Sequence, residues 1–282
     1  MSQCIVNALT FDVEDYFQVS AMAPHVARSD WEGMPRRVGA NTHRILDVLS
    51  EAGVRATFFT LGWVAERYPE LVRRIVADGH ELASHGYGHQ RVTDLTLSAF
   101  RDDIVRAKRI LEDVGGVAVR GYRAPSFSIG AGNLDALQVL KETGHRYSSS
   151  IYPVRHDHYG MPDAPRTPFS PLGTEGVVEL PMGTVRVAGH NAPAAGGGYF
   201  RLLPYPVSRW ALQRVNLREG RPTVFYLHPW EIDPGQPRIP GVTWKTRFRH
   251  YVNLARTEPR LQRLLHDFRW DRIDTVFAEA TA

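Results

Sequence analysis

Short apolar runs alternate with amphipathic segments through the first 230 residues, and this alternation predicts the secondary structure. Apolar runs rich in β-forming residues predict buried strands at residues 4–11, 55–61, 80–83, 117–122, 145–148 and 223–228. Apolar residues at helical spacing predict helices at 41–50, from Pro69 to Gly79, from Phe100 to Gly115, and at 134–142. Such an α/β order predicts parallel strands with helices outside them, as a barrel or an open sheet.

Two regions interrupt this alternation. Residues 153–175 are crowded with Pro, Gly, His and Asp, which predicts a long surface loop. Residues 189–206 contain Gly196, Gly197 and Gly198 flanked by prolines. A glycine run suggests a phosphate cradle only weakly here, because no Lys-Ser/Thr pair follows it and no clear helix starts after it.

Composition and charge exclude several classes of protein. The chain has 282 residues, 43% of them hydrophobic, so it can bury a core without a disulfide, and the single Cys4 is expected to be a buried apolar residue. The net charge of +4 arises largely in the last fifty residues, where acids are interspersed, which favours a solvated face over a nucleic-acid site. No segment approaches a membrane span or a secretory signal, so we expect a cytoplasmic protein.

Candidate chemistry follows the ends of two predicted strands. Asp12, Glu14 and Asp15 follow the first strand, and three neighbouring carboxylates need cations to compensate them unless they form a solvated acidic turn. His85 and His89 follow the third strand. Two imidazoles four residues apart can bind one ion, and the intervening glycines allow the backbone to bend. Two His and one carboxylate are typical of catalytic zinc and iron sites.

Three more side chains lie at predicted strand ends. Arg123 could pair with a carboxylate, although a surface arginine is the simpler interpretation of that residue alone. His228 can titrate near neutral pH, which suits a general acid. Trp230 offers an apolar face for a sugar ring, or closes the core at its rim.

Four of these motifs, in this order, resemble the NodB-like polysaccharide deacetylases, also called carbohydrate esterase family 4. The motifs are TFDVED, SHGYGH, GYRAP and YLHPW, and the similarity covers roughly residues 5–230. The phrases FDVEDYF, LGWVAERYP, YRAPSFSI and FYLHPWEIDP are closer still to the subgroup of exopolysaccharide loci, which has an additional C-terminal segment.

The resemblance implies a distorted (β/α) barrel of seven or eight strands and a divalent metal ion, commonly zinc. It implies that His85 and His89 bind the metal, that Asp12 is the catalytic base, that Arg123 tethers this base, and that His228 is the catalytic acid. The implied activity is hydrolysis of an N-acetyl group from a sugar in an oligo- or polysaccharide. We expect Tyr16, Pro125 and Trp230 to contact this substrate.

The chain departs from the family pattern at two places. The first motif commonly has adjacent aspartates, whereas here Asp12 is followed by Val13, Glu14 and Asp15. A strand that continues past Asp12 would put Glu14 on the same side, while a tight turn could present Asp15, so either residue is a candidate third ligand. The second departure is the serine run at 148–150, where many relatives have an aspartate.

The resemblance also suggests a division of the chain and two rival functions. We expect a deacetylase barrel at residues 1–232 and an extension at 233–282 that packs on it, with a helix at 254–268. The aromatic and basic segment 244–251 packs on the barrel too or, as the alternative, extends a glycan groove. One rival is a metal-independent allantoinase-like or cyclic-imide hydrolase, which the intact histidine pair disfavours. The other is a non-catalytic carbohydrate-binding protein, which would use aromatic residues but not Asp12 or His228.

Overall fold

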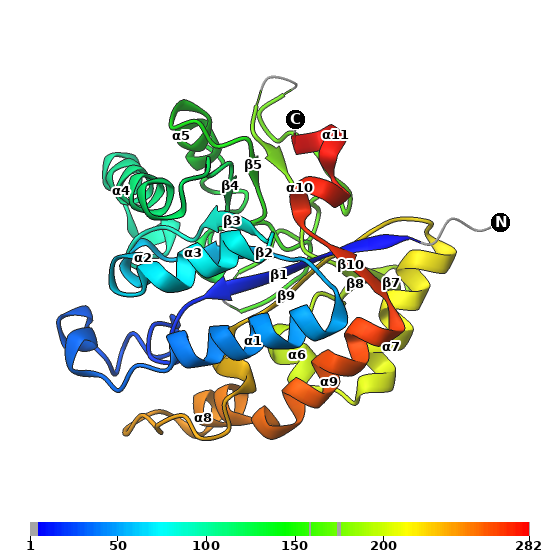
Figure 1. Cartoon of the computed structure of the whole chain (residues 1–282). Coiled ribbons are helices and arrows are strands. Elements are labelled where there is room, and N and C mark those ends of the chain that lie inside the picture. The colour runs from blue at the N-terminus through cyan, green and yellow to red at the C-terminus, as the bar shows by residue number, and fades with distance from the viewer. Residues whose placement is uncertain (1–4, 158, 174–175, 282) are drawn as a thin grey trace.

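A curled parallel sheet wrapped by helices forms the centre of the molecule (Figure 1). The structure is a computed structural model that describes residues 5–157, 159–173 and 176–281. Cys4, which we expect to be a buried strand residue, lies outside the described residues. No helix within the described residues is long and apolar enough to cross a bilayer.

Eight strands form the main sheet, in the order β10-β1-β2-β3-β4-β5-β6 with β9 on the other side of β1. All their pairings are parallel. Their bounds are β1 Val6–Val13, β2 Thr57–Thr60, β3 Glu81–Ser84, β4 Gly121–Tyr122, β5 Tyr147–Ser148, β6 Val178–Glu179, β9 Val224–Leu227 and β10 Arg269–Asp271.

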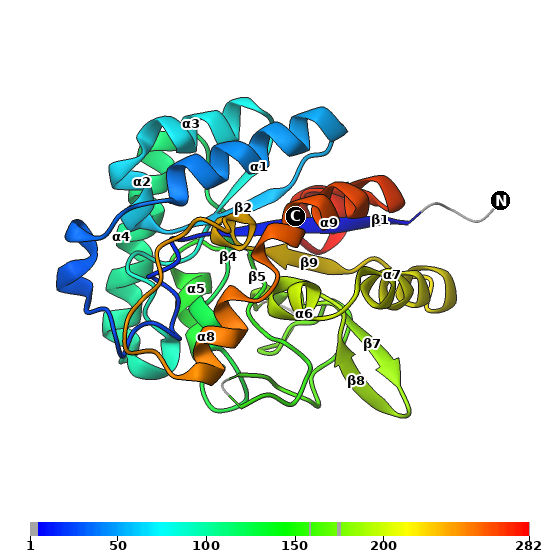
Figure 2. The ribbon, with the colours of Figure 1, turned by 90° about the horizontal axis from the view of Figure 1, so that it is seen from below.

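The two ends of the curled sheet are joined by short bridges. Met182, just after β6, pairs in parallel with Val224 of β9, and Gly196 pairs with Tyr226 of the same strand. β4, β5 and β6 have two residues each, so the wall is irregular on that side. The predicted distorted (β/α) barrel is therefore confirmed. The antiparallel hairpin of β7 (Thr184–Val187) and β8 (His190–Pro193) projects from it (Figure 2).

Helices cover the outside of the sheet in both views (Figures 1 and 2). Gly53 and Gly116 end α1 and α4 in the left-handed conformation, which glycine adopts without steric cost. The principal helices are α1 Val38–Ala52, α2 Gly62–Arg67, α3 Pro69–Ala77, α4 Leu97–Gly115, α5 Ala136–Glu142, α6 Gly197–Leu202, α7 Tyr205–Gln213, α8 Trp244–Tyr251, α9 Leu254–Asp267, α10 Ile273–Val276 and α11 Ala278–Thr281.

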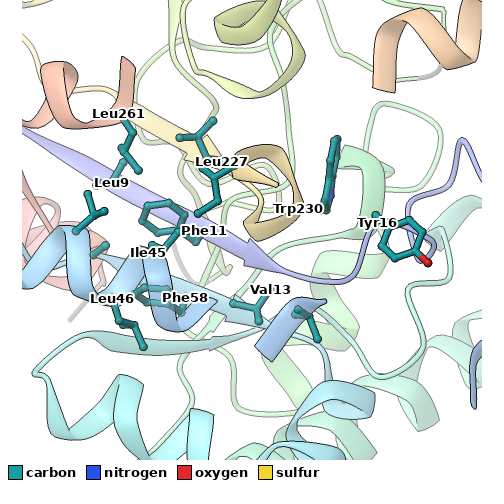
Figure 3. Close-up of a cluster of buried hydrophobic side chains, with 14 of the residues drawn as sticks. Leu9, Phe11, Val13, Tyr16, Ile45, Leu46, Phe58, Leu227, Trp230 and Leu261 are labelled. Carbon is teal, nitrogen blue, oxygen red and sulfur yellow. The ribbon is translucent and has the colours of Figure 1, made fainter. Parts of the chain in front are cut away.

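β1 separates the outer core from the barrel interior. Alternate residues Leu9, Phe11 and Val13 are fully buried in the cluster that also contains residues of α1 and α9 (Figure 3). Because side chains alternate along a strand, Thr10 and Asp12 lie on the opposite face, towards the interior. The hydrophobic side of β1 therefore anchors the strand, while its polar side supplies the site.

The segment after residue 233 is integrated into the fold. α9 contacts α1, and β10 extends the sheet by pairing with Val6–Ala8 at the beginning of β1. β10 was not predicted because three residues, RWD, carry too little alternation to identify a strand. The domain boundary at residue 232 stays a prediction. β10, which follows this boundary in the sequence, joins the same sheet as the strands that precede it.

The glycine run has a packing role that the sequence pattern did not indicate. Gly196 precedes α6 with φ of 102°, and a Cβ there would lie 2.1 Å from the carbonyl oxygen of Tyr226. We expect Gly196→Ala to lower the free energy of unfolding by roughly 3 kcal/mol or more, because it adds a backbone clash to left-handed strain. Gly189 is the control, since it is also left-handed but has open space around it. Equal losses for the two alanine variants in denaturant titrations would contradict the close-packing role.

Candidate active site

Asp12 and Glu14 point into one pocket at the carboxyl end of β1. The strand continues to Val13, so these two carboxylates share a face by the two-residue period of a strand. Both residues are buried, with exposed fractions of at most 2%. The pocket is open to solvent, and its other polar walls are formed by residues from the ends of further strands, among them His85, His89 and His228. The sequence motifs thus converge on one cavity.

Arg123 forms a buried ion pair with the carboxylate of Asp12. Its Nη1 lies 2.6 Å from Asp12 Oδ1 and 2.7 Å from Thr10 Oγ1. Its Nε and Nη2 donate to the carbonyl oxygen and the hydroxyl of Ser149, each at 3.0 Å. Because Arg123 is fully buried, its charge requires these partners. The interpretation of Arg123 as a surface residue is therefore wrong.

The serine run, at the place where many relatives have an aspartate, supplies hydrogen-bond acceptors to Arg123 and to the backbone beside it. Ser149 supplies two of the acceptors of Arg123, and Ser150 Oγ accepts the N–H of Ala124 at 2.9 Å. Glu179 of β6 in turn accepts the N–H of Ser150 and that of Ile151, each at 2.7 Å. The network leaves the backbone donors of Arg123 and Ala124 occupied, since Arg123 N–H donates to Ser84 O. Neither of these two N–H groups is therefore available to donate a hydrogen bond to a bound substrate.

His85, His89 and Glu14 form a candidate metal centre. One ligand atom of each lies within 4.8 Å of those of the others. Glu14 Oε2 is 2.6 Å from His89 Nε2 and 4.0 Å from His85 Nε2. A buried carboxylate oxygen that faces two imidazole nitrogens is the arrangement that a divalent cation would complete. The residues present therefore fit a metal ion.

The protonation states in this cluster suit ligation. His85 Nδ1 lies 2.8 Å from the carbonyl oxygen of Arg123, so this nitrogen donates and Nε2 presents its lone pair to the site. Burial lowers the pKa of His85 to about 4, which keeps it neutral. Burial alone would raise the pKa of Glu14, but the neighbouring imidazoles lower it to about 2. The cluster thus offers the Nε2 lone pair of His85 and one anionic oxygen beside the imidazole of His89.

The loop after β3 brings the two imidazoles together. Gly86 and His89 have φ values of 74° and 51°, so the segment bends instead of forming a helix, as the glycines indicate. Asp103 of α4 accepts the N–H groups of Tyr87 and Gly88 and holds the bend. The two rings lie 5.3 Å apart between centroids.

Asp15, the alternative third ligand, is engaged elsewhere. Its Oδ1 accepts the N–H of Tyr16 at 2.9 Å, and its Oδ2 accepts those of Arg37 and Val38 at 2.7 and 3.0 Å. These bonds tie the start of α1 to the end of β1, which is a capping role. Burial raises the pKa of Asp15 to about 6 despite them. The structure groups Glu14, and not Asp15, with the two histidines.

His228 faces the same pocket and is held by Glu231. His228 Nε2 lies 3.5 Å from Glu14 Oε1 and 3.9 Å from Asp12 Oδ2, while its Nδ1 lies 3.0 Å from Glu231 Oε2. Burial alone would lower the pKa of His228, but the surrounding carboxylates raise it to about 9. Nδ1 therefore donates to Glu231, and a protonated Nε2 points into the pocket.

Glu231 belongs to a buried ion pair that the sequence analysis missed. Its Oε1 lies 2.6 Å from Arg201 Nε, and its Oε2 also accepts the N–H of His228 at 2.9 Å. Burial would raise the pKa of Glu231, but Arg201 and His228 lower it to about 2. The signal available in the sequence was a glutamate three residues after His228, the spacing of a capping box. Arg201 had no comparable signal.

The predicted substrate contacts divide into two groups. Trp230 lines the pocket, stacks at 5.2 Å on the ring of His228, and its Nε1 donates to Glu14 Oε1 at 3.3 Å. Tyr16 is fully buried in the outer core, since the chain turns inward after Glu14, so it is not among the residues of the pocket wall. Pro125 is also buried and is not among the residues that line the pocket, while its neighbours Ser126 and Phe127 are.

Comparison with protein families decides the assignment of the chain. The family model described as polysaccharide deacetylase matches residues 5–148, slightly more than half of the 282 residues. The chain belongs to the polysaccharide deacetylase family. A second model, a domain of unknown function (DUF3473) found in deacetylases of exopolysaccharide loci, matches residues 149–278. The resemblance stated from the motifs is confirmed.

Among curated relatives, this polysaccharide deacetylase homologue is 37% identical over 84 residues to a peptidoglycan-N-acetylglucosamine deacetylase from Bacillus cereus, covering 30% of each chain. The chain spans half or less of the length of the curated relatives it matches. A solved structure of a candidate polysaccharide deacetylase from Mycobacterium smegmatis superposes over 100% of this chain and 91% of its own, with a TM-score of 0.66 at 21% identity. A CE4 family pseudoenzyme from Bacillus anthracis gives a TM-score of 0.50 at 17% identity, over 98% and 66% of the two chains. These two likenesses show the fold alone.

Proposed function

We propose that this protein is a metal-dependent hydrolase that removes the acetyl group from an N-acetylated sugar of an exopolysaccharide or its precursor. The observation that carries the proposal is the convergence of an Arg123-tethered Asp12, the Glu14–His85–His89 cluster and His228 on one pocket. The family match supports the reaction class, and the second domain supports the exopolysaccharide context. A cytoplasmic location stays a prediction.

Glu14, His85 and His89 would hold a divalent metal, of which zinc is the one that this donor set suits best. When bound, the metal supplies Lewis-acid polarisation of the acetyl carbonyl and a lowered pKa for the attacking water. The fold supplies this centre with buried, oriented ligands, because the carbonyl oxygen of Arg123 determines the tautomer of His85.

Asp12 and His228 are arranged to move protons in opposite directions. Arg123 occupies Oδ1 of Asp12, which leaves Oδ2 facing the pocket to take a proton from water as the new C–O bond forms. His228 then donates its Nε2 proton to the amide nitrogen as the C–N bond breaks. The products are acetate and a free amino sugar. Trp230 lines the pocket beside His228 and holds the His228 ring by stacking on it.

The test is acetate release by metal-stripped protein from N-acetylated oligosaccharides and lipid-linked precursors, with Zn²⁺, Co²⁺ or Mn²⁺ added back singly. We expect no acetate without metal and restored release with at least one ion, together with one free amine per acetate. Full activity after metal removal would favour the metal-independent hydrolase. Saccharide binding that is undiminished in Asp12→Asn, with no acetate from any substrate, would favour the carbohydrate-binding protein.

A further inference from the structure

α8 lies at the edge of the molecule (Figures 1 and 2). It carries two large apolar side chains that are exposed to solvent. Trp244 is 81% exposed and Phe248 is 53% exposed. They are four residues apart, so they lie on the same side of the helix. We expected the segment 244–251 to pack on the barrel, and for these two residues that prediction is wrong.

The opposite side of α8 is firmly attached to the pocket wall. His250 is buried, stacks on Trp230 with 4.3 Å between centroids, and its Nε2 lies 2.9 Å from Gln236 Oε1. Arg201 Nη1 donates to the carbonyl oxygens of His250 and Val252, at 2.9 and 3.1 Å. Because the inner side of the helix is held in this way, the outward direction of Trp244 and Phe248 is a property of the fold.

Cationic side chains flank the exposed pair. Lys245 and Arg249 lie on one side and Arg247 lies on the other, as their positions around the helix require. Asp157 is within 3.5 Å of Lys245 Nζ and 3.7 Å of Arg249 Nη2, so one carboxylate faces two cations. The helix therefore keeps an excess of positive charge around an apolar patch.

We propose that α8 is an interfacial anchor that binds the protein to an anionic phospholipid membrane. An amphipathic helix with aromatic residues on its apolar side and flanking Lys and Arg is suited to the interface between headgroups and acyl chains. Docking through Trp244 and Phe248 would place the pocket beside the membrane surface, because Trp230 joins the inner side of α8 to the pocket wall. This inference goes beyond the proposed function, since binding of vesicles requires no catalysis.

Two other occupants fit the patch less well. A glycan that continues out of the pocket would contact the wall at Trp230, whereas Trp244 and Phe248 point to the other side of the helix from His250. A second copy of the chain would bring its own flanking cations against Lys245, Arg247 and Arg249 in a symmetric contact. An anionic surface is complementary to the charge that surrounds the aromatic pair.

The experiment is co-sedimentation of the full chain with vesicles of phosphatidylcholine alone or mixed with phosphatidylglycerol. We expect binding to the mixed vesicles that weakens as salt is raised. The double variant W244A/F248A should bind at least about tenfold more weakly, because two aromatic side chains no longer enter the bilayer. K245Q/R247Q should bind several-fold more weakly to the mixed vesicles only.

The matched control is W210A/L217A, which removes an exposed apolar pair on and just after α7, with Trp210 46% and Leu217 72% exposed. This control should bind as the wild type does, and thermal unfolding should show all variants folded. The proposal is overturned if the wild type ignores mixed vesicles or if W244A/F248A binds them normally. It is also overturned if that variant instead loses affinity for a soluble N-acetylated oligosaccharide, or loses self-association, without a change in vesicle binding.

Discussion

Replacing Glu14 with glutamine is expected to remove the bound metal and at least about 10³ of kcat/KM for deacetylation. The glutamine has nearly the same shape, but it replaces the anionic oxygen that lies 2.6 Å from His89 Nε2 with a neutral ligand. A catalytic metal contributes several kcal/mol to transition-state stabilisation, which corresponds to a loss of this size. Elemental analysis after gel filtration measures the metal, and acetate release measures the activity. His85→Ala is expected to lose both in the same way.

Asp15→Asn is the matched control, because Asp15 is the neighbouring carboxylate and is equally buried. Its oxygens accept three backbone N–H groups, so the variant should lose roughly 1 kcal/mol of stability at the start of α1. It should keep its metal and most of its activity. If Asp15→Asn lost the metal while Glu14→Gln kept it, the assignment of the third ligand would be reversed.

The side of β1 that carries the site was predictable from local rules. A strand that continues past Asp12 puts Glu14 on the same face, and β1 does continue to Val13. The glycines around His85 and His89 likewise indicated a bend, and Gly86 adopts a positive φ. What local rules left open was the choice between Glu14 and Asp15. That choice depends on Arg37 and Val38, whose N–H groups donate to Asp15 although they lie more than twenty residues away in the sequence.

Long-range packing explains the remaining differences. Tyr16 was expected to contact the substrate, but the chain turns into the outer core at that point. β6 has two residues and β10 three, so neither shows a recognisable period. Gly196 and Gly197 face the backbone and ring of Tyr226, a close approach that depends on the closing of the barrel. Such contacts join segments that share no local sequence signal.

Removing the charge of Glu231 is expected to weaken proton donation by His228 selectively. Glu231 Oε2 accepts from Nδ1 of His228, so it orients the ring and stabilises its protonated form. In Glu231→Gln the pKa of His228 falls. A general acid works only below its pKa, so the alkaline loss of activity should move to lower pH. Amide hydrolysis should fall by about 10². Hydrolysis of an aryl acetate should fall much less, because a phenolate leaves without protonation.

The same substitution leaves Arg201 buried without its anionic partner, and stability should fall by about 3–5 kcal/mol. The double variant Glu231→Gln with Arg201→Met removes both charges and should recover part of this loss. Its ratio of amide to aryl-ester activity should nevertheless stay low, because His228 still lacks its acceptor carboxylate. If both activities fell by one common factor and recovered together in the double variant, Glu231 would act only through folding. If the double variant recovers stability but not the ratio of amide to aryl-ester activity, Glu231 positions His228 and is more than one half of a structural ion pair.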